Sequence, residues 1–424
     1  MFTHLHFHTL YSALDALSDP LEAALAVAKD GGTALALTDH GTMAGIVTFS
    51  KACKEADIKP IFGMEAYMSY WDSKLPSPVK VPRSHLTILA KNKTGLGNLF
   101  ELQRKSYSTG GNQDLTLNDL SSFKEGLIVT SGCLYGYIPS IACRHAIQTK
   151  QLRRNDSVFR PLTIVLGSYT NQYRDSAVRF AEALKKIMGD DFYIEVQDHG
   201  LAEQRYFNNS VAPTLAKRLN TKIVPTNDSH YVTKDEALAH SYISAIRMHQ
   251  RGGTVRGSRD LHLKTDKEME KLFPREMLDI SNDIAAQIDD NVYEVVKHTP
   301  AYNTRGRPAN DILSDKAWSK LDGMYGIGNK EAQARLDHEL KITRALGFAD
   351  YLLIVSDIVD ETKRRSGEMP GPGRGSAAGS ILSYLLGITD IDPLEHGLMF
   401  SRFISKARFT VDTDTSLDFG LNNG

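Results

Sequence analysis

Three histidines alternate with apolar residues at the start of the chain. His4, His6 and His8 are two residues apart, with Leu5 and Phe7 between them. This period of two predicts a β-strand that has one imidazole face and one apolar face. Side chains two residues apart in a strand point the same way, at a separation of roughly 7 Å. Two such imidazoles could hold one or two metal ions, and a plain surface strand is the weaker interpretation.

Further metal-binding residue types recur over the first 230 positions, mostly where predicted strands end. They combine imidazole, carboxylate and one thiol, a mixture that suits a cluster of zinc or manganese ions bridged by Asp or Glu. A divalent ion lowers the pKa of water and so prepares it to attack a phosphodiester. The candidate ligands are His6, His8, Asp15, His40, Glu65, His85, Cys133, Asp228 and His230. His85 is the exception to the rule, because it falls at the start of its predicted strand.

A glycine-rich segment at residues 370–380 precedes a predicted helix that begins at about residue 377. Free N–H groups at the start of a helix, together with the helix dipole, favour a bound anion. Arg374 adds a bidentate phosphate donor. The spacing differs from the Walker A pattern because no Gly-Lys-Ser/Thr follows. The segment therefore predicts a phosphate-binding turn, with a flexible linker as the alternative.

Two carboxylates alternate near the end of the chain. In a strand, Asp412 and Asp414 would point to one face and could share divalent ions. Paired carboxylates are what two-metal phosphoryl transfer requires. Such a pair alone is more often a turn, but its position after the predicted phosphate-binding turn favours the metal-binding interpretation.

The composition is that of an ordinary globular protein. The chain has 424 residues, 41% of them hydrophobic, and a formal net charge of −1, which suggests two or three domains. Nucleic-acid binding would then need local patches or metal ions. Three cysteines argue for a reducing cytoplasm. Since we find neither a signal peptide nor an apolar run near the roughly 20 residues of a membrane span, we expect a cytoplasmic protein without membrane contact.

Predicted strands alternate with helices over the first part of the chain. The strands are expected at residues 34–37, 60–65, 86–90, 126–130, 192–196 and 222–226. This order predicts an α/β fold with a mainly parallel sheet, closed or nearly closed into a barrel. Such barrels place their chemistry at the C-terminal ends of strands. From about residue 280 helical patterns dominate, and an arginine-rich stretch at 246–264 is either a phosphate-binding loop or a solvated surface loop.

Two groups of motifs resemble the C family of bacterial replicative DNA polymerases, the alpha subunits of DNA polymerase III. The first group comprises His-Leu-His-Phe-His-Thr at 4–9, Leu-Thr-Asp-His-Gly at 37–41, Ser-Gly-Cys-Leu at 131–134, Phe-Tyr-Ile-Glu at 192–195 and Asn-Asp-Ser-His-Tyr at 227–231. The second comprises Gly-Pro-Gly-Arg-Gly-Ser-Ala-Ala-Gly-Ser at 371–380 and Gly-Ile-Thr-Asp-Ile-Asp-Pro at 387–393. The resemblance runs through nearly the whole chain.

The resemblance implies two domains. Residues 1–275 would form a PHP (polymerase and histidinol phosphatase) domain, a distorted (β/α) barrel, and residues 276–424 the start of an α+β, polymerase-beta-like palm. The nine candidate ligands match the metal ligands of the PHP domain. Family members that keep these ligands can have a metal-dependent 3′–5′ exonuclease, and members that lost some use the domain as a scaffold.

The resemblance also assigns roles in the palm. Gly375 and Ser376, together with Arg374, would hold the triphosphate of an incoming dNTP. Asp412 and Asp414 match the first two catalytic aspartates, which bind Mg²⁺. This stretch departs from the family pattern at two positions. Val411 stands where the family usually has proline, and Ser416 stands where it usually has a third aspartate.

The family continues through thumb, fingers and clamp-binding regions that lie beyond residue 424. We therefore expect the chain to be the N-terminal part of a polymerase, unable to polymerise by itself. Its expected partners are DNA, dNTPs and the remaining polymerase half or other replisome subunits. Two alternatives remain: a non-catalytic, metal-stabilised scaffold that docks another subunit, and a stand-alone phosphoesterase for small phosphate esters, against which the palm motifs argue.

Overall fold

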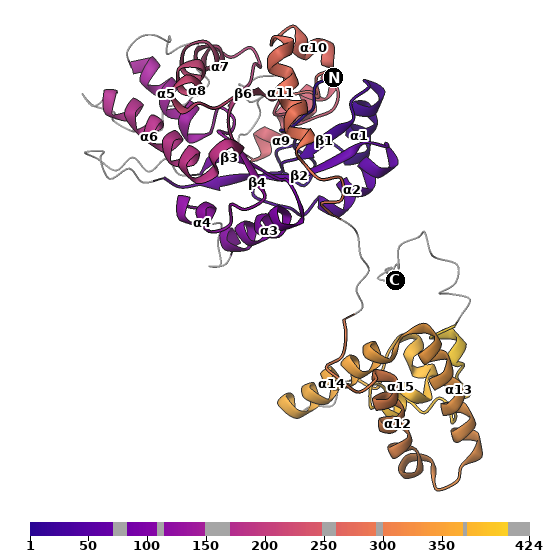
Figure 1. The fold of residues 1–424 in the computed structure, drawn as a ribbon. Helices are drawn as coiled ribbons and strands as arrows, with labels where there is room; N and C mark the ends of the chain where they lie inside the picture. The colour runs from indigo at the N-terminus through magenta and orange to yellow at the C-terminus, as the bar shows by residue number, and fades with distance from the viewer. Residues whose placement is uncertain are drawn as a thin grey trace. The chain divides into compact units, whose positions relative to one another are not determined.

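The chain folds into two compact units, Met1–Val295 and Val296–Gly424. The computed structural model, drawn in Figure 1, describes residues 1–70, 83–107, 114–148, 170–247, 260–293, 300–367 and 371–405. In the described residues no helix is both long and apolar enough to cross a membrane. Each unit has its own hydrophobic core, so each is described separately.

A six-stranded sheet in the order β1-β2-β3-β4-β5-β6 forms the centre of the first unit. The strands are β1 Ala34–Leu37, β2 Lys59–Met68, β3 Ser84–Ala90, β4 Leu127–Thr130, β5 Phe192–Val196 and β6 Ile223–Pro225. Parallel pairing joins β1 to β2, β4 to β5 and β5 to β6, whereas β3 is antiparallel to both of its neighbours. The six predicted strands are confirmed, and the sheet is mixed because β3 is inverted.

The inversion of β3 explains the exceptional position of His85. In an antiparallel pair the start of one strand lies beside the end of the other, and His85 is opposite Tyr67 near the end of β2. His85 therefore reaches the same end of the sheet as Glu65, although it begins its own strand. The chemistry is still at one end of the sheet, but one strand contributes its N-terminal end to it.

The N-terminal histidine segment is not a continuous strand, in contrast to the prediction. It makes two isolated parallel bridges, one from His4 to Leu35 of β1 and one from Phe7 to Ser229 just after β6. The segment thus lies between the first and last strands of the curled sheet and brings its two edges together. Both faces of the segment are buried, because Leu5 and Phe7 enter the core while His6 faces the end of the barrel.

Helices surround the sheet (Figure 1). They are α1 Pro20–Lys29, α2 Ile46–Glu55, α3 Lys93–Tyr107, α4 Leu117–Ser122, α5 Tyr137–Gln148, α6 Thr170–Met188, α7 Ala202–Tyr206, α8 Ala212–Leu219, α9 Ala237–Arg247, α10 Asp266–Glu270 and α11 Arg275–Ala286. The start of α1 follows from local chemistry, since the Asp19 carboxylate accepts from two backbone N–H groups and Pro20 occupies the first turn. A π-helical turn at Phe207–Val211 joins α7 to α8.

The first unit ends later than the expected boundary after residue 275. Helix α11 packs against β6, and its residues Leu278, Ile284 and Ala285 belong to the barrel core. Ile288 and Val292 extend that core further. Burial of these side chains keeps α11 with the barrel, so the division falls after Val295.

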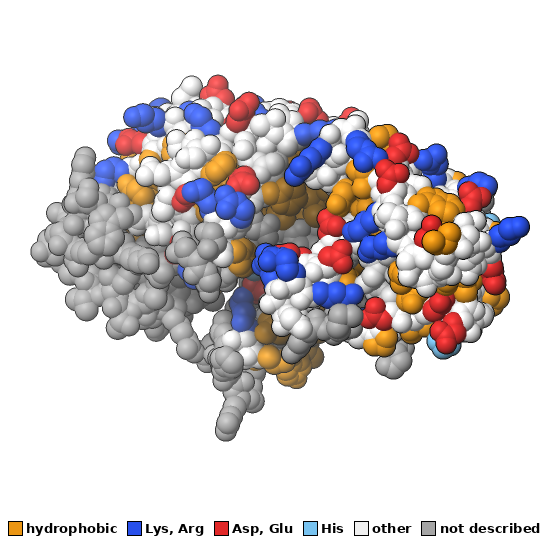
Figure 2. Space-filling model, turned by 90° about the horizontal axis from the view of Figure 1, so that it is seen from below, with side chains coloured by type: hydrophobic (Ala, Val, Ile, Leu, Met, Phe, Trp, Pro, Cys, Tyr) orange, Lys and Arg blue, Asp and Glu red, His pale blue; other side chains and the backbone are white. Residues whose placement is uncertain are grey.

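The described residues of the second unit form helices and connecting loops, and none of them is in a strand. It contains α12 Ala309–Tyr325, α13 Lys330–Leu346, α14 Ala349–Ser366, a 3₁₀ turn at Gly375–Gly379, α15 Ile381–Leu385 and a 3₁₀ turn at Phe400–Arg402. Leu336 and Leu353 pack with Ile381 and Leu382 in its core. On the face shown in Figure 2, acidic and basic side chains are interspersed, in line with the net charge of −1.

Candidate metal centre and phosphate-binding turn

The structure brings all nine candidate ligands together at one end of the barrel. The N-terminal segment supplies His6 and His8, the loop before α1 supplies Asp15, and His40 follows β1. Glu65 and His85 come from β2 and β3, Cys133 follows β4, and Asp228 and His230 follow β6. Seven separate stretches of backbone thus meet at one end of the sheet, and two of them supply two ligands each.

Glu65 is the central carboxylate of this set. Its Oε1 lies 2.9 Å from His85 Nδ1 and 3.3 Å from His6 Nε2. Its Oε2 lies 2.6 Å from His40 Nδ1 and 3.8 Å from His8 Nε2. The side chain is fully buried. One carboxylate thus faces four imidazoles, two at each oxygen, as a bridging ligand between cations would.

Two further carboxylates and the thiol lie around this core. Asp228 Oδ1 is 3.2 Å from His8 Nε2, 3.4 Å from His6 Nε2 and 3.6 Å from His230 Nδ1. Asp15 Oδ2 lies 2.6 Å from His40 Nε2, and Cys133 Sγ lies 3.3 Å from His85 Nδ1. Three sets have ligand atoms within 4.8 Å of one another: His8-His40-His230, His6-His8-Asp228 and His40-Glu65-His85.

The unpartnered atoms of this centre fit divalent cations. Both Glu65 oxygens, Asp228 Oδ1 and His40 Nδ1 are buried without hydrogen-bond geometry to any neighbour, despite the short distances. The Nε2 atoms of His6 and His8 approach within 3.1 Å. A buried carboxylate that no hydrogen bond satisfies is costly. Because imidazole, carboxylate and thiol atoms all converge, a shared cation such as zinc or manganese is the partner that this donor set suits.

The two adjacent imidazoles His6 and His8 have opposite protonation preferences. Burial disfavours the charged form of both rings. At His6 the carboxylates of Asp228, Glu195 and Glu65 outweigh burial and raise the pKa well above its usual value. At His8 burial and the neighbouring His40 lower the pKa to about 3. His8 is therefore held as the neutral imidazole, which is the form that binds metal.

Glu195 was not singled out as a functional residue from the sequence. Its carboxylate lies 2.6 Å from His6 Nδ1, so that His6 Nε2 is directed towards Glu65 and Asp228. Such a contact orients a metal-binding imidazole. The same carboxylate accepts hydrogen bonds from Thr87, Thr130, Gln197 and Thr226. The sequence signal that could have identified Glu195 is its position as an acidic residue within an otherwise apolar strand.

Asp39 supports the centre in a second place that sequence reasoning missed. Its carboxylate accepts from the Thr9 N–H, the Thr9 hydroxyl and the Ser12 hydroxyl, each at 2.7 Å. The Ser12 hydroxyl in turn lies 3.2 Å from His8 Nδ1. Asp39 thus holds the loop after His8 rather than facing the cluster itself.

The glycine-rich turn of the second unit differs from its prediction in one respect. The helix begins at Ile381 rather than near residue 377, and its first N–H groups are occupied. Those of Ile381 and Leu382 both donate to the buried carboxylate of Glu339 at 3.1 Å, and the Ser380 hydroxyl donates to it at 2.7 Å. An internal anion therefore takes the place that the sequence suggested for a ligand.

The exposed part of the turn is held from both sides. Arg335 donates to the carbonyls of Gly379 and Leu398 and to Glu339, and the Asp390 N–H donates to the Pro372 carbonyl. Arg374, Gly375 and Ser376 lie between these anchors and are exposed. Gly375 has φ +72°, a conformation that favours glycine. What remains available to an anion is this exposed turn and the Arg374 side chain.

Comparison with known proteins identifies both parts. Residues 4–199 match the model described as "PHP domain", and residues 311–422 match "Bacterial DNA polymerase III alpha NTPase domain". DNA polymerase III subunit alpha of Campylobacter jejuni is 32% identical over 99% of this chain and 36% of its own length. The Helicobacter pylori protein of the same name is 32% identical over 97% of this chain and 35% of its own length.

The chain belongs to the family of bacterial DNA polymerase III alpha subunits. It spans about a third of the length of these curated relatives. Among solved structures, an amidohydrolase from Chromobacterium violaceum is 17% identical, with a TM-score of 0.29, and the match covers 55% of this chain and 89% of that one. A structural similarity at this level adds nothing to the family assignment, which rests on the sequence relatives.

Some predicted residues of the polymerase part lie outside the described residues. These are Asp412 and Asp414, together with Val411 and Ser416. Most of the arginine-rich stretch at 246–264 is also outside them. Of its described members, Arg247 pairs with Asp15 beside the metal centre. Lys264 is buried and donates to Asp260, so it does not bind a phosphate at the surface.

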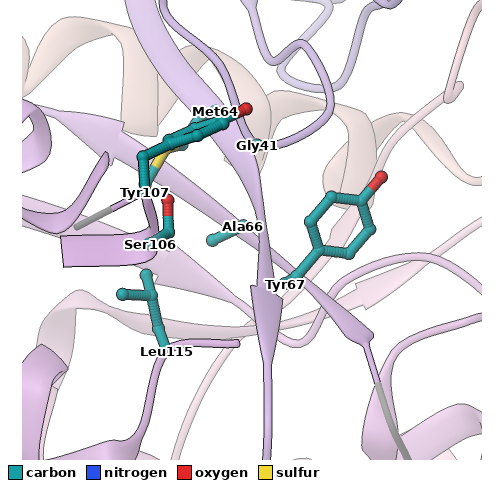
Figure 3. Close-up of a pocket in the computed structure, with 7 residues that line it drawn as sticks. All are labelled: Gly41, Met64, Ala66, Tyr67, Ser106, Tyr107 and Leu115. Carbon is teal, nitrogen blue, oxygen red and sulfur yellow. The ribbon is translucent and has the colours of Figure 1, made fainter. Parts of the chain in front are cut away.

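A small pocket lies beside β2 (Figure 3). Met64 and Ala66 line it, and by the alternation of a strand they face away from Glu65. Tyr107 and Leu115 contribute further apolar surface. None of the nine candidate ligands is among the residues that line the pocket, and Tyr67, which stacks on His40, adjoins both.

Proposed function

We propose that the first unit is a metal-dependent phosphodiesterase that removes nucleotides from the 3′ end of DNA, as a 3′–5′ exonuclease. The environment of Glu65 carries this proposal. Its buried carboxylate faces four imidazoles, but neither of its oxygens forms a hydrogen bond. Such a carboxylate is suited to bridge cations. Membership of a polymerase family supports DNA as the substrate, and the cytoplasm as the place of action.

The residues of the chain would act in separate roles. His6, His8, Asp15, His40, Glu65, His85, Cys133, Asp228 and His230 would hold a cluster of Zn²⁺ or Mn²⁺. Bound cations would supply Lewis-acid stabilisation of the phosphoryl charge and a nucleophile at neutral pH. Glu195 would keep His6 in the tautomer that ligates through Nε2, and Asp39 would keep the loop after His8 in place.

The second unit would contribute to the palm of a DNA polymerase. Arg374, Gly375 and Ser376 would bind the triphosphate of a dNTP, and Asp412 and Asp414 would bind Mg²⁺. The exposure of the turn between two buried anchors supports this role. The remaining polymerase half or other replisome subunits would be its partners.

The nuclease is tested with the purified chain and 3′-labelled single-stranded DNA in the presence of Mn²⁺ or Zn²⁺. Mononucleotides should be released, and His8→Ala should abolish their release because it removes a buried ligand at the centre of the cluster. His396→Ala is the matched control, since His396 is exposed in the second unit. Equal inertness of the wild type and His8→Ala would refute the nuclease.

Complete burial of His6, His8 and Glu65 favours a second candidate, a metal-stabilised scaffold that docks another subunit. Here chelation lowers the melting temperature although there is no nuclease activity to lose. Turnover of histidinol phosphate without action on DNA would instead support a phosphoesterase for small esters. The same purified chain answers all three questions.

A further inference from the structure

Two tyrosines flank the histidine that β3 contributes to the metal centre. The ring of Tyr67 lies 5.3 Å from the ring of His85 in an edge-on arrangement, and the ring of Tyr135 lies 5.8 Å from it. Tyr67 also stacks 6.1 Å from His40. Aromatic surface is therefore present beside the ligands, on two sides of one imidazole.

The backbone of Tyr135 is held beside the metal centre, although the residue is exposed. The His85 N–H donates to the Tyr135 carbonyl at 3.2 Å, and the Tyr135 N–H donates to the Cys133 sulfur. The residue nevertheless has an exposed fraction of 57%. Because its backbone is already fixed, an exposed ring of this kind loses conformational freedom only in its side chain when a ligand stacks on it.

Arg83 adds a cation at the same place. It directly precedes β3 and stands two residues before His85, and its backbone has φ +57°. Its guanidinium lies 4.2 Å from the centre of the Tyr67 ring, and its backbone N–H donates to Asp114. In the described residues no ion pair joins a carboxylate to this guanidinium, which lies over the Tyr67 ring instead.

Two exposed leucines stand in the loop that carries Asp15. Together with Tyr135 and Arg83 they form what we call the rim, exposed side chains that each stand at most two residues from a candidate ligand. Leu10 and Leu14 in this loop are 47% and 53% exposed, and Leu14 has φ +60°, which directs the chain into a conformation that leucine seldom adopts. Exposed apolar groups gathered beside a site mark a surface that a ligand covers. A small, fully polar phosphate ester would gain nothing from them, whereas a nucleobase has an apolar face to bury.

We propose that this rim is a binding platform for the terminal nucleotide of a single-stranded nucleic acid: the base stacks on Tyr135, and the Arg83 guanidinium, held over Tyr67, binds a phosphate oxygen. The inference rests on the proposed nuclease and names what its substrate must carry, namely a nucleobase next to the bond that breaks. Stacking on an aromatic ring discriminates little between bases, so the platform accepts any sequence.

The test compares two single-stranded oligonucleotides that differ only in the terminal 3′ residue, thymidine in one and an abasic tetrahydrofuran residue in the other. Wild type should cleave the thymidine substrate with a kcat/KM about tenfold higher, the value of one stacked base. Tyr135→Ala should bring the ratio to near one, and Tyr135→Phe should restore it because the ring is what stacks. Tyr351→Ala in the second unit is the matched control.

Arg83 has a different expected effect. Arg83→Ala should raise KM for both oligonucleotides by a similar factor and leave the ratio between them unchanged, and Arg83→Lys should recover part of the loss. A merely structural role of either residue would lower kcat and thermal stability without touching the ratio.

The outcomes separate the platform from the nuclease. If wild type cleaves both oligonucleotides equally, or if Tyr135→Ala keeps the full preference, the platform is refuted and the nuclease stands. If wild type cleaves neither, the nuclease is refuted, and fluorescence anisotropy of the same oligonucleotides decides on the platform. There Tyr135→Ala must weaken binding of the thymidine form alone, and unchanged binding refutes the platform as well.

Discussion

Each of the two units buries a glutamate completely, and the two glutamates are satisfied in different ways. Glu65 in the barrel faces four imidazole nitrogens, yet neither of its oxygens has a hydrogen bond. Glu339 in the helical unit accepts from Arg335, Ser380 and two backbone N–H groups. A bound cation would be the missing partner of the first carboxylate, whereas the oxygens of the second already accept hydrogen bonds.

The pKa of each carboxyl group reflects this difference. Burial raises the pKa of both. At Glu65 the imidazoles of His85, His40 and His6 outweigh burial, and the pKa lies well below its usual value. At Glu339 burial dominates over the hydrogen bonds, and the pKa is raised. A buried carboxylate is therefore a sign of a ligand site only when its neighbours leave its lone pairs unused.

Removal of metal should have the largest effect and should act on the first unit alone. Chelation with EDTA should destabilise the barrel by about 4 kcal/mol, the value expected when a ligand is present at a thousand times its dissociation constant. Calorimetry and hydrogen exchange, resolved by unit, would measure this difference. Glu65→Gln should make the barrel insensitive to the chelator, with exposed Glu125→Gln as control. A similar response of both units would remove the distinction between the two glutamates.

Loss of the second glutamate should be severe but independent of metal. Glu339→Leu leaves the Nε–H of Arg335 and two helix N–H groups without their acceptor, which should cost about 3 kcal/mol or more. Urea unfolding would measure the change, and faster exchange of the Leu382 amide would locate it. Asp337→Asn is the control: its exposed pair with Lys341 should contribute less than about 1 kcal/mol. Rescue of Glu339→Leu by added metal would contradict the assignment.

A buried histidine outside the ligand set should give the smallest effect. Burial lowers the pKa of His199 to about 4, while its ring lies 2.5 Å from the Asn227 carbonyl. The unfolded chain binds a proton at His199 more tightly than the folded chain does. The contribution of the neutral, buried His199 to the free energy of unfolding is therefore complete above about pH 6.5 and is lost as the pH falls towards 4. Between pH 7 and pH 5 the wild type should lose roughly 2 kcal/mol that His199→Gln does not lose.

The measurement is the free energy of unfolding of both proteins at the two pH values, in metal-free buffer so that the ligand histidines contribute equally. Exposed His396→Gln should keep the wild-type dependence. Identical pH dependence in all three proteins would show that His199 is not held neutral by its burial.

The strands and the ligand types were accessible to sequence reasoning because they depend on local patterns. The apolar runs at β1 and β5 define strands by themselves, and both have the predicted bounds. Asp19 and Pro20 define the start of α1 in the same local way. The histidine segment was harder, because its alternation is that of a strand while its backbone makes only isolated bridges to Leu35 and Ser229.

By itself, the sequence determined the family, the α/β character of the first unit, the set of candidate ligands and the exposed Arg374 turn, because residue types and short spacings encode all of these. Only the tertiary structure decided that β3 is inverted, that Glu195 orients His6, and that Glu339 takes the helix N–H groups. Each of these depends on residues far apart in the chain: 189 positions separate His6 from Glu195, and 42 separate Glu339 from Ile381. Such contacts follow from how packed elements meet in space, which no local pattern specifies.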